Sequence, residues 1–136
     1  MSYSFGKNSL KNRAGINPDL IAVLDLAVEI SIIDFGVPQL GGIRTSVEQK
    51  KLFDNGLSRA NGTKHLSLHQ SGNAVDVFAI HPETGKASWE REHLAIVAAA
   101  ILQSASALNI ELQWGGLWDF CDMPHFQLGE NHGNTE

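Results

Sequence analysis

The chain contains a single cysteine, Cys121, among its 136 residues. An internal disulfide is therefore excluded, and a lone thiol fits synthesis in a reducing cytoplasm. A thiol protease would need a histidine and an aspartate arranged around the nucleophile, and no such set surrounds Cys121. We interpret Cys121 as a small, buried, apolar residue.

Long hydrophobic segments are also missing. The N-terminal residues 1–8 have no apolar core of signal-peptide length. The longest apolar-rich run, residues 94–108, is interrupted by Gln103 and several serines, so it is too short and too polar to span a membrane. We expect a soluble protein that is made without its own export signal and is not inserted into a membrane.

Clustered positive charge is the third absence. Ten Lys and Arg residues are scattered among fifteen Asp and Glu residues, which gives a formal net charge of -5. Because nucleic-acid-binding proteins carry clustered basic residues, a nucleic-acid partner is not expected. The length and the 43% hydrophobic content fit one domain, residues 1–136. Its polar end, residues 129–136, is expected to form a flexible tail.

Helix signals occur at three places. Asn17 and Pro18 form a favourable helix start, and apolar residues then recur at helical spacing until about residues 31–34. Thr45 and Glu48 match a capping box for a short helix that ends at residues 55–56. Ser88 is expected to cap the longest helix, which runs to about Leu108.

Strand-like segments are interleaved with these helices. The expected strands are residues 35–40, 74–79, 110–114 and 124–128. Residues 1–16 are expected to form an extended arm or a short turn, and residues 57–66 a polar loop. This order of elements predicts a compact α+β domain.

The sequence SLHQSGNAVD, residues 67–76, holds two residues that commonly bind metals. His69 and Asp76 flank a turn at Gly72, and both imidazole nitrogen and carboxylate oxygen bind zinc. A single histidine or aspartate in a loop is usually solvated or hydrogen-bonded. However, Asp76 lies in an apolar strand, where a carboxylate needs a partner to offset its desolvation. A metal site and an ordinary polar turn therefore both remain open.

The next candidates lie far from this stretch. His125 is either a core histidine or a third metal ligand, and Asp122 lies three residues before it. A catalytic zinc site needs a carboxylate that takes a proton from the metal-bound water, and Asp122 could supply it. Arg44, which follows two glycines and an isoleucine, is either a surface cation or a clamp for an oxyanion or carboxylate.

The remaining histidines are interpreted as non-ligands. His65 lies four residues before His69, so the two could share a metal if this segment were helical. Gly62, Ser67 and Gly72 argue against a helix there. The other three occur in a turn, a helix and the tail: His81, His93 and His132.

Several segments together resemble a known family. The pattern S-x-H-x-x-G-x-A-x-D of residues 67–76 resembles the signature of zinc D-Ala-D-Ala carboxypeptidases and L-alanyl-D-glutamate endopeptidases. Segments GIRT, WGGLW and DMPHF, which contain Arg44, Trp114 and His125, resemble further family blocks. The start, residues 5–9, is similar to phage endolysins of this family. The resemblance covers nearly the whole chain and implies the hedgehog/D-Ala-D-Ala peptidase fold, a small antiparallel sheet packed by helices.

The resemblance also implies roles for individual residues. One zinc ion per chain would be bound by His69, Asp76 and His125. Asp122 would be the catalytic carboxylate, and Arg44 would steady the substrate or its oxyanion. Supporting or substrate-binding roles are implied for Ser67, Trp114 and Trp118.

Two positions depart from many relatives. Leu117 stands where an aspartate is common, and Gln127 stands where a glutamate is common. Neither is a zinc ligand in this scheme. A neutral Gln127 would raise the basicity of His125 less than a carboxylate would.

The expected function is that of a zinc-dependent peptidoglycan hydrolase, a phage endolysin that cleaves the L-alanyl-D-glutamate bond of stem peptides. A D-alanyl-D-alanine carboxypeptidase shares the same metal chemistry and is the first alternative. A non-catalytic, zinc-stabilised wall-binding module is the alternative from another class, although Asp122 and Arg44 speak against it. We expect a monomer that is made in the host cytoplasm and acts on peptidoglycan in the periplasm after release.

Overall fold

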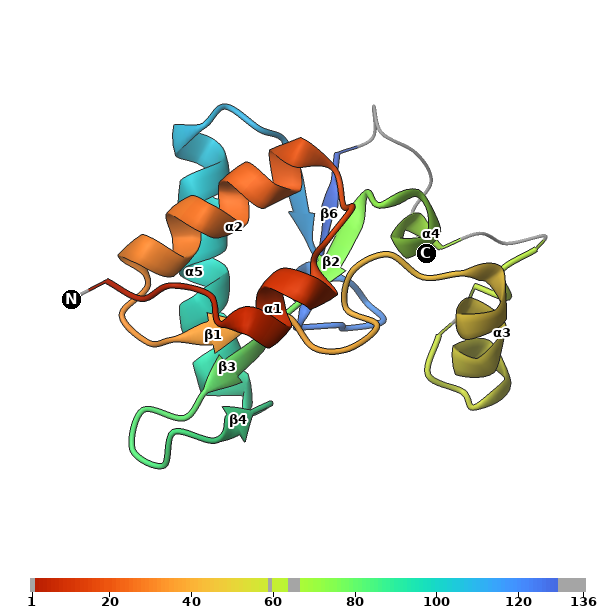
Figure 1. Ribbon diagram of the computed structural model, residues 1–136, viewed down its shortest axis with the longest axis horizontal. Coiled ribbons are helices and arrows are strands. Elements are labelled where there is room, and N and C mark those ends of the chain that lie inside the picture. Colours follow the sequence, from red (N-terminus) through yellow and green to blue (C-terminus); the bar gives the residue numbers. More distant parts are fainter. Residues whose placement is uncertain (1, 59, 64–66, 130–136) are drawn as a thin grey trace.

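The two longest helices pack against each other. In this computed structural model, which describes residues 2–58, 60–63 and 67–129, they are α2 (Pro18–Ile30) and α5 (Arg91–Ala107). Helix α2 begins as predicted, because the Asn17 side chain accepts a hydrogen bond from the backbone N–H of Asp19. The alanine-rich face of α5 permits close packing against α2 (Figure 1).

The other elements are short. In chain order they are α1 (Lys7–Asn12), β1 (Phe35–Gly36), α3 (Ser46–Asp54), α4 (Leu68–Ser71), β2 (Ala74–Asp76), β3 (Phe78–Ile80), β4 (Ala87–Ser88), β5 (Leu112–Trp114), the 3-10 turn η1 (Gly115–Leu117) and β6 (His125–Leu128). Helix α3 begins at the predicted capping box of Thr45 and Glu48. Within the described ranges, no helix has the length and apolar character needed to cross a membrane.

The predicted α+β fold with antiparallel strands packed by helices is confirmed, and the strands divide between two sheets. Their orders are β1-β3-β4 and β2-β6-β5. Residues 74–79, expected as one strand, separate at Val77 into β2 and β3, one in each sheet. At this point the N–H of Asp76 donates to the carbonyl of Gly41 (2.8 Å), and the N–H of Val77 donates to that of Pro124 (2.9 Å). Two loops thus bind the backbone where β2 ends, which fixes Asp76 at the end of its strand.

The prediction for the N-terminal arm is wrong, because helix α1 forms within it. Ser9 on this helix is buried, and its hydroxyl accepts a hydrogen bond from the N–H of Val37 (3.0 Å). The side chain of Asn12 donates to the carbonyl of Val37 (2.8 Å). These bonds to a distant segment stabilise a helix that is too short to be stable by local propensity.

A one-turn helix that was not predicted, α4, begins directly after Ser67. The Ser67 hydroxyl accepts a hydrogen bond from the N–H of His69, and the Gln70 side chain accepts one from the N–H of Ser67, so the two form a capping box for α4. Gly72 ends α4 in the left-handed conformation, with φ of 79°. The predicted turn at Gly72 is therefore the C-cap of a one-turn helix.

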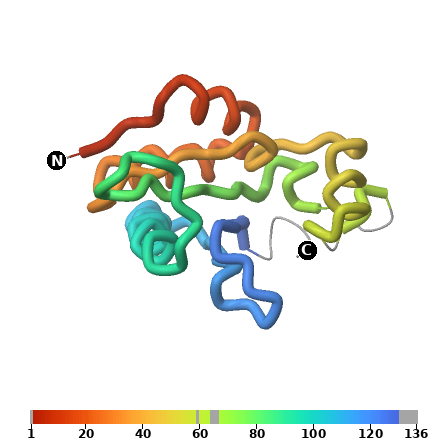
Figure 2. The backbone as a smooth tube through the Cα atoms, turned by 90° about the horizontal axis from the view of Figure 1, so that it is seen from below, coloured from red at the N-terminus to blue at the C-terminus, as the bar shows by residue number. Residues whose placement is uncertain are grey.

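Two further local predictions are wrong. Ser88 lies in β4 and does not cap α5, whose N-cap is Glu90 without a side-chain capping bond. The Ser88 hydroxyl instead lies 2.7 Å from Nδ1 of His93. Cys121 is exposed, in the connection between β5 and β6 that projects from the body of the molecule (Figure 2). His65, His132 and residues 130–136 of the expected tail lie outside the described residues.

Candidate metal centre

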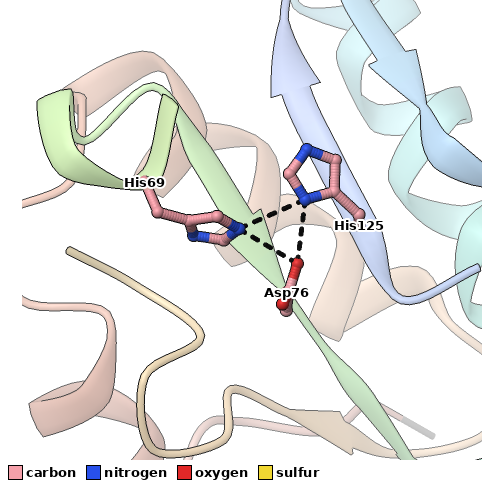
Figure 3. A group of neighbouring side chains, drawn as sticks. All are labelled: His69, Asp76 and His125. Atoms are coloured by element: carbon pink, nitrogen blue, oxygen red, sulfur yellow. Dashed lines mark hydrogen bonds and ion pairs between the residues drawn. The ribbon is translucent and has the colours of Figure 1, made fainter. Parts of the chain in front are cut away.

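Three side chains from three different elements converge on one point (Figure 3). His69 comes from α4, Asp76 from the end of β2 and His125 from the start of β6. Strands β2 and β6 are antiparallel, and their register places Asp76 directly opposite His125. The structure therefore brings together the three residues that the sequence proposed as metal ligands.

The spacing of the three donor atoms suits one small cation. Nε2 of His69 lies 3.2 Å from Nδ1 of His125 and 3.3 Å from Oδ1 of Asp76, and the last two atoms are 3.0 Å apart. Zinc ligands lie about 2.0–2.2 Å from the ion, so the edge of a zinc tetrahedron measures about 3.3–3.6 Å. The three atoms thus approximate one face of such a tetrahedron.

The hydrogen bonds behind the histidines fix which nitrogen faces the cluster. Nδ1 of His69 donates to the carbonyl of Gly42 (3.0 Å), and Nε2 of His125 donates to Oε1 of Gln127 (2.9 Å). Both rings are fully buried. The unprotonated nitrogens therefore point at each other and at Asp76. A proton can bridge only one pair of these atoms, whereas a metal cation contacts all three.

Gly42 has to be glycine for this arrangement. A Cβ atom at this position would overlap the backbone carbonyl of Asn12, at the end of α1. The close approach of these two segments sets the position of the Gly42 carbonyl that holds His69.

Asp76 carries negative charge at this point. Burial raises the pKa of its carboxyl, but whenever His69 or His125 carries a proton on the nitrogen that faces it, their charge and hydrogen bonding lower this pKa by more, and the net value lies below the usual range. The second oxygen, Oδ2, accepts a hydrogen bond from Nη2 of Arg44 at 3.0 Å. Asp76 thus presents one oxygen to the cluster and the other to Arg44.

Arg44 is buried, which rules out the interpretation as a surface cation. Its Nε donates to the carbonyl of Leu40 (2.8 Å), and its Nη1 donates to Oε1 of Gln49 (3.0 Å). Arg44 and Asp76 also line a cavity of about 520 Å³. The guanidinium and Asp76 therefore lie together at the border of the candidate metal cluster with a space that can hold a ligand.

Asp122 lies in the turn that leads into β6. Its backbone N–H donates to the carbonyl of Gly115 (2.8 Å), and its carbonyl accepts from the N–H of His125 (3.1 Å). The turn therefore ties Asp122 to the start of the strand that carries His125. Among the described residues, the group of converging metal-type donors does not include Asp122.

The three predicted supporting residues have separate positions. Ser67 is buried and caps α4, the helix that carries His69. The ring N–H of Trp114 donates to the carbonyl of Met123 (2.7 Å), which gives this residue a structural contact. The ring of Trp118 lies 5.3 Å from that of His125. Trp118 is thus the predicted aromatic residue whose ring lies against a candidate ligand.

Sequence reasoning gave no role to two parts of this site. Gln49, on helix α3, holds Arg44, and the Gly42 carbonyl orients His69. Gln49 lies in a helix that the sequence predicted, but a glutamine there is equally compatible with an ordinary helix surface. A backbone carbonyl leaves no sequence signal.

A second group of metal-type donors consists of His81, Glu90 and His93. Oε2 of Glu90 lies 3.8 Å from Nε2 of His81 and 3.3 Å from Nδ1 of His93. However, Nδ1 of His81 accepts hydrogen bonds from the N–H groups of Glu83 and Thr84. The proton of the neutral ring is therefore on Nε2, the nitrogen that a metal would need. This favours the predicted interpretation of His81 and His93 as non-ligands.

Comparisons with known proteins identify related peptidases. The model of the phage L-alanyl-D-glutamate peptidase family matches residues 1–128. The chain is 37% identical over 120 residues to the L-alanyl-D-glutamate peptidase of Escherichia phage T5, a match that covers 88% of this chain and 84% of that one. The crystal structure of the L-Ala D-Glu endopeptidase ChiX of Serratia marcescens superimposes with a TM-score of 0.78 and 34% identity, covering 94% of this chain and 92% of ChiX.

A buried cluster of two histidines and an aspartate beside a cavity is a donor set of the kind that can hold a catalytic metal ion. The extent of the sequence matches specifies the family more narrowly. The chain belongs to the phage L-alanyl-D-glutamate peptidase family.

Proposed function

We propose that this protein is a zinc-dependent endopeptidase that cleaves the L-alanyl-D-glutamate bond of peptidoglycan stem peptides. Family membership supports the reaction. The proposed metal site is supported by one observation. Nε2 of His69, Oδ1 of Asp76 and Nδ1 of His125 converge to within 3.3 Å of one another. One zinc ion per chain would be bound by these atoms.

The mechanism assigns different tasks to the surrounding residues. Zinc, when bound, supplies a Lewis acid that polarises the scissile carbonyl and acidifies a water molecule. Asp122 takes the proton from the attacking water and passes it to the leaving amine. Arg44, which lines the cavity beside Asp76, helps to stabilise the negative charge that develops on the substrate.

The cavity next to the cluster is the proposed binding site for the stem peptide. Its walls combine the charged pair of Arg44 and Asp76 with apolar side chains, among them Leu40, Leu52 and Trp89. A pocket with apolar walls and a few fixed polar groups is typical of sites that orient a small flexible ligand. Trp118, whose ring lies against that of His125, is proposed to contact the substrate from the other side of the cluster.

The biological setting follows from the same proposal. The enzyme would act as a monomeric phage endolysin, synthesised in the host cytoplasm and active on the cell wall from the periplasm. Relatives from a phage and from a bacterium that share the activity in their names support action on the wall.

Product analysis tests the bond that is cleaved. Digestion of purified peptidoglycan is expected to generate new N-terminal D-glutamate, which mass spectrometry of the released peptides detects. Release of free D-alanine would instead identify a D-alanyl-D-alanine carboxypeptidase. Zinc binding without any new terminus would identify a non-catalytic wall-binding module.

Gln127 provides a test of the metal site that does not touch the ligands. Replacing Gln127 by leucine removes the acceptor for Nε2–H of His125, and we expect zinc affinity to fall by about 10–100-fold. Competition with a chromogenic chelator measures this affinity. Gln127→Glu keeps an acceptor and should retain zinc. The matched control is Gln113→Leu, which removes only a neighbour of the Gln127 amide and should leave affinity unchanged.

A further inference from the structure

Helix α3 is joined to the rest of the molecule by a polar side chain. Gln49 is its one buried residue, with no exposed surface at all, whereas Val47 and Phe53 on the same helix are exposed. Both views place α3 at one end of the molecule, away from α2 and α5 (Figures 1 and 2). A surface helix is normally held by an apolar face, so the contacts of Gln49 must supply much of what fixes α3.

The amide of Gln49 binds in two directions. Its Oε1 accepts a hydrogen bond from Nη1 of Arg44 (3.0 Å). Its Nε2 donates to the hydroxyl of Ser58 (2.7 Å) and to the carbonyl of Ala60 (2.8 Å). Both amide N–H groups and the oxygen are therefore used. A buried amide satisfied in this way has one stable orientation.

In one direction the bonds lead to the metal cluster. Gln49 holds one nitrogen of Arg44, and another nitrogen of Arg44 holds Oδ2 of Asp76 at 3.0 Å. With Oδ2 fixed, Oδ1 of Asp76 is directed at the two histidines. Groups behind a ligand set its orientation and so its affinity for the metal.

In the other direction the bonds lead to the cavity wall. Leu52 on α3 and Leu57 just after it line the cavity that also contains Arg44 and Asp76. Ser58 and the backbone of Ala60, which follow Leu57, are attached to α3 through Gln49. The position of this wall therefore depends on the same amide that orients Arg44.

We propose that Gln49 is a positioning residue of the active site, which orients Asp76 through Arg44 and holds α3 in place as one wall of the substrate cavity. This inference rests on the proposed function, because it assigns zinc to the cluster and the stem peptide to the cavity. Gln49 is not one of the proposed metal ligands. Different substitutions at this one position are expected to change zinc affinity and substrate affinity independently.

Two substitutions separate the effect of Gln49 on Arg44 from its effect on the cavity wall. Gln49→Met has a similar length but removes all three hydrogen bonds, so we expect zinc affinity to fall about tenfold and KM to rise. Gln49→Glu keeps an acceptor for Arg44 and loses the donor to the Ala60 carbonyl. Its zinc affinity should therefore stay close to that of the unaltered protein while its KM rises. Chelator competition measures zinc affinity without any need for activity, and steady-state hydrolysis of a soluble stem peptide gives KM.

Controls distinguish positioning from general loss of stability. Val97→Ala, in the core on α5, should lower the melting temperature but change neither zinc affinity nor KM. In an Arg44→Leu background, Gln49→Met should cause no further loss of zinc affinity, because the two residues act in series. A loss of full size in that background would contradict the link through Arg44.

The outcomes also separate this inference from the proposed function. If the unaltered protein neither binds zinc nor hydrolyses peptidoglycan, the proposed function fails. If it does both, and Gln49→Met matches it in zinc affinity and KM, only the role of Gln49 is wrong. If Gln49→Met does not fold, the Gln49→Glu variant provides the test. Reduced zinc affinity in Gln49→Glu would contradict the link to Asp76. An unchanged KM in Gln49→Glu would contradict the link to the cavity wall.

Discussion

Replacing Asp122 by asparagine is expected to reduce hydrolysis by about 10²–10⁴-fold, the usual contribution of a general acid–base group. Asparagine has nearly the same shape but cannot take a proton. The turn that contains Asp122 is held by backbone hydrogen bonds to Gly115 and His125, which this substitution does not alter. Bound zinc should therefore stay near one equivalent per chain, as measured by atomic absorption.

The same connection offers a matched control. Asp119 is an exposed carboxylate between η1 and Asp122, and Asp119→Asn should leave both hydrolysis and zinc unchanged. This pair separates the effect of one carboxylate from a general change of charge near the site. Full activity in Asp122→Asn would remove Asp122 from the mechanism.

Removal of the metal should have the second large effect. Chelation is expected to abolish hydrolysis and to lower the melting temperature, because the buried donor atoms of His69, Asp76 and His125 then face one another without a cation. Zinc at about 1,000 times its Kd stabilises a protein by about 4 kcal/mol. For a domain of this size such a difference corresponds to a shift on the order of 10 °C, which differential scanning fluorimetry measures.

Substitutions at the two histidine clusters assign this effect to one of them. His69→Ala should lose zinc, activity and the thermal shift together. His93→Ala alters the second cluster, formed with His81 and Glu90, and should retain one equivalent of zinc and normal hydrolysis. An active protein that contains no zinc would contradict the metal assignment as a whole.

The candidate ligands could be named from the sequence, but their convergence could not. A pattern of ten residues singled out His69 and Asp76, and a second pattern singled out His125. Their contact depends on the register of β2 against β6, which joins residues 49 positions apart. Hydrophobic periodicity predicts that a strand exists and not which residue of another strand lies opposite.

The errors in the predicted fold have similar causes. Helix α1 depends on hydrogen bonds from Ser9 and Asn12 to a distant segment. The run 74–79 has a single pattern of apolar residues, yet loops that bind the backbone of Asp76 and Val77 divide it between two sheets. In both places, contacts between distant segments decide the local structure. Helix α4 is different, because the residues of its capping box, Ser67 and Gln70, were visible in the sequence, but the prediction did not use them.

The contact between Gly42 and the end of α1 has a practical consequence for anyone who produces this enzyme. The carbonyl of Gly42 orients His69, and the backbone of Asn12 packs against Gly42 so closely that no side chain fits between them. The N-terminal helix thus supports the metal ligand from behind, although it contributes no atom to the cluster. A shortened N-terminus that removes α1 is therefore expected to loosen His69, and with it the proposed zinc site, in recombinant material.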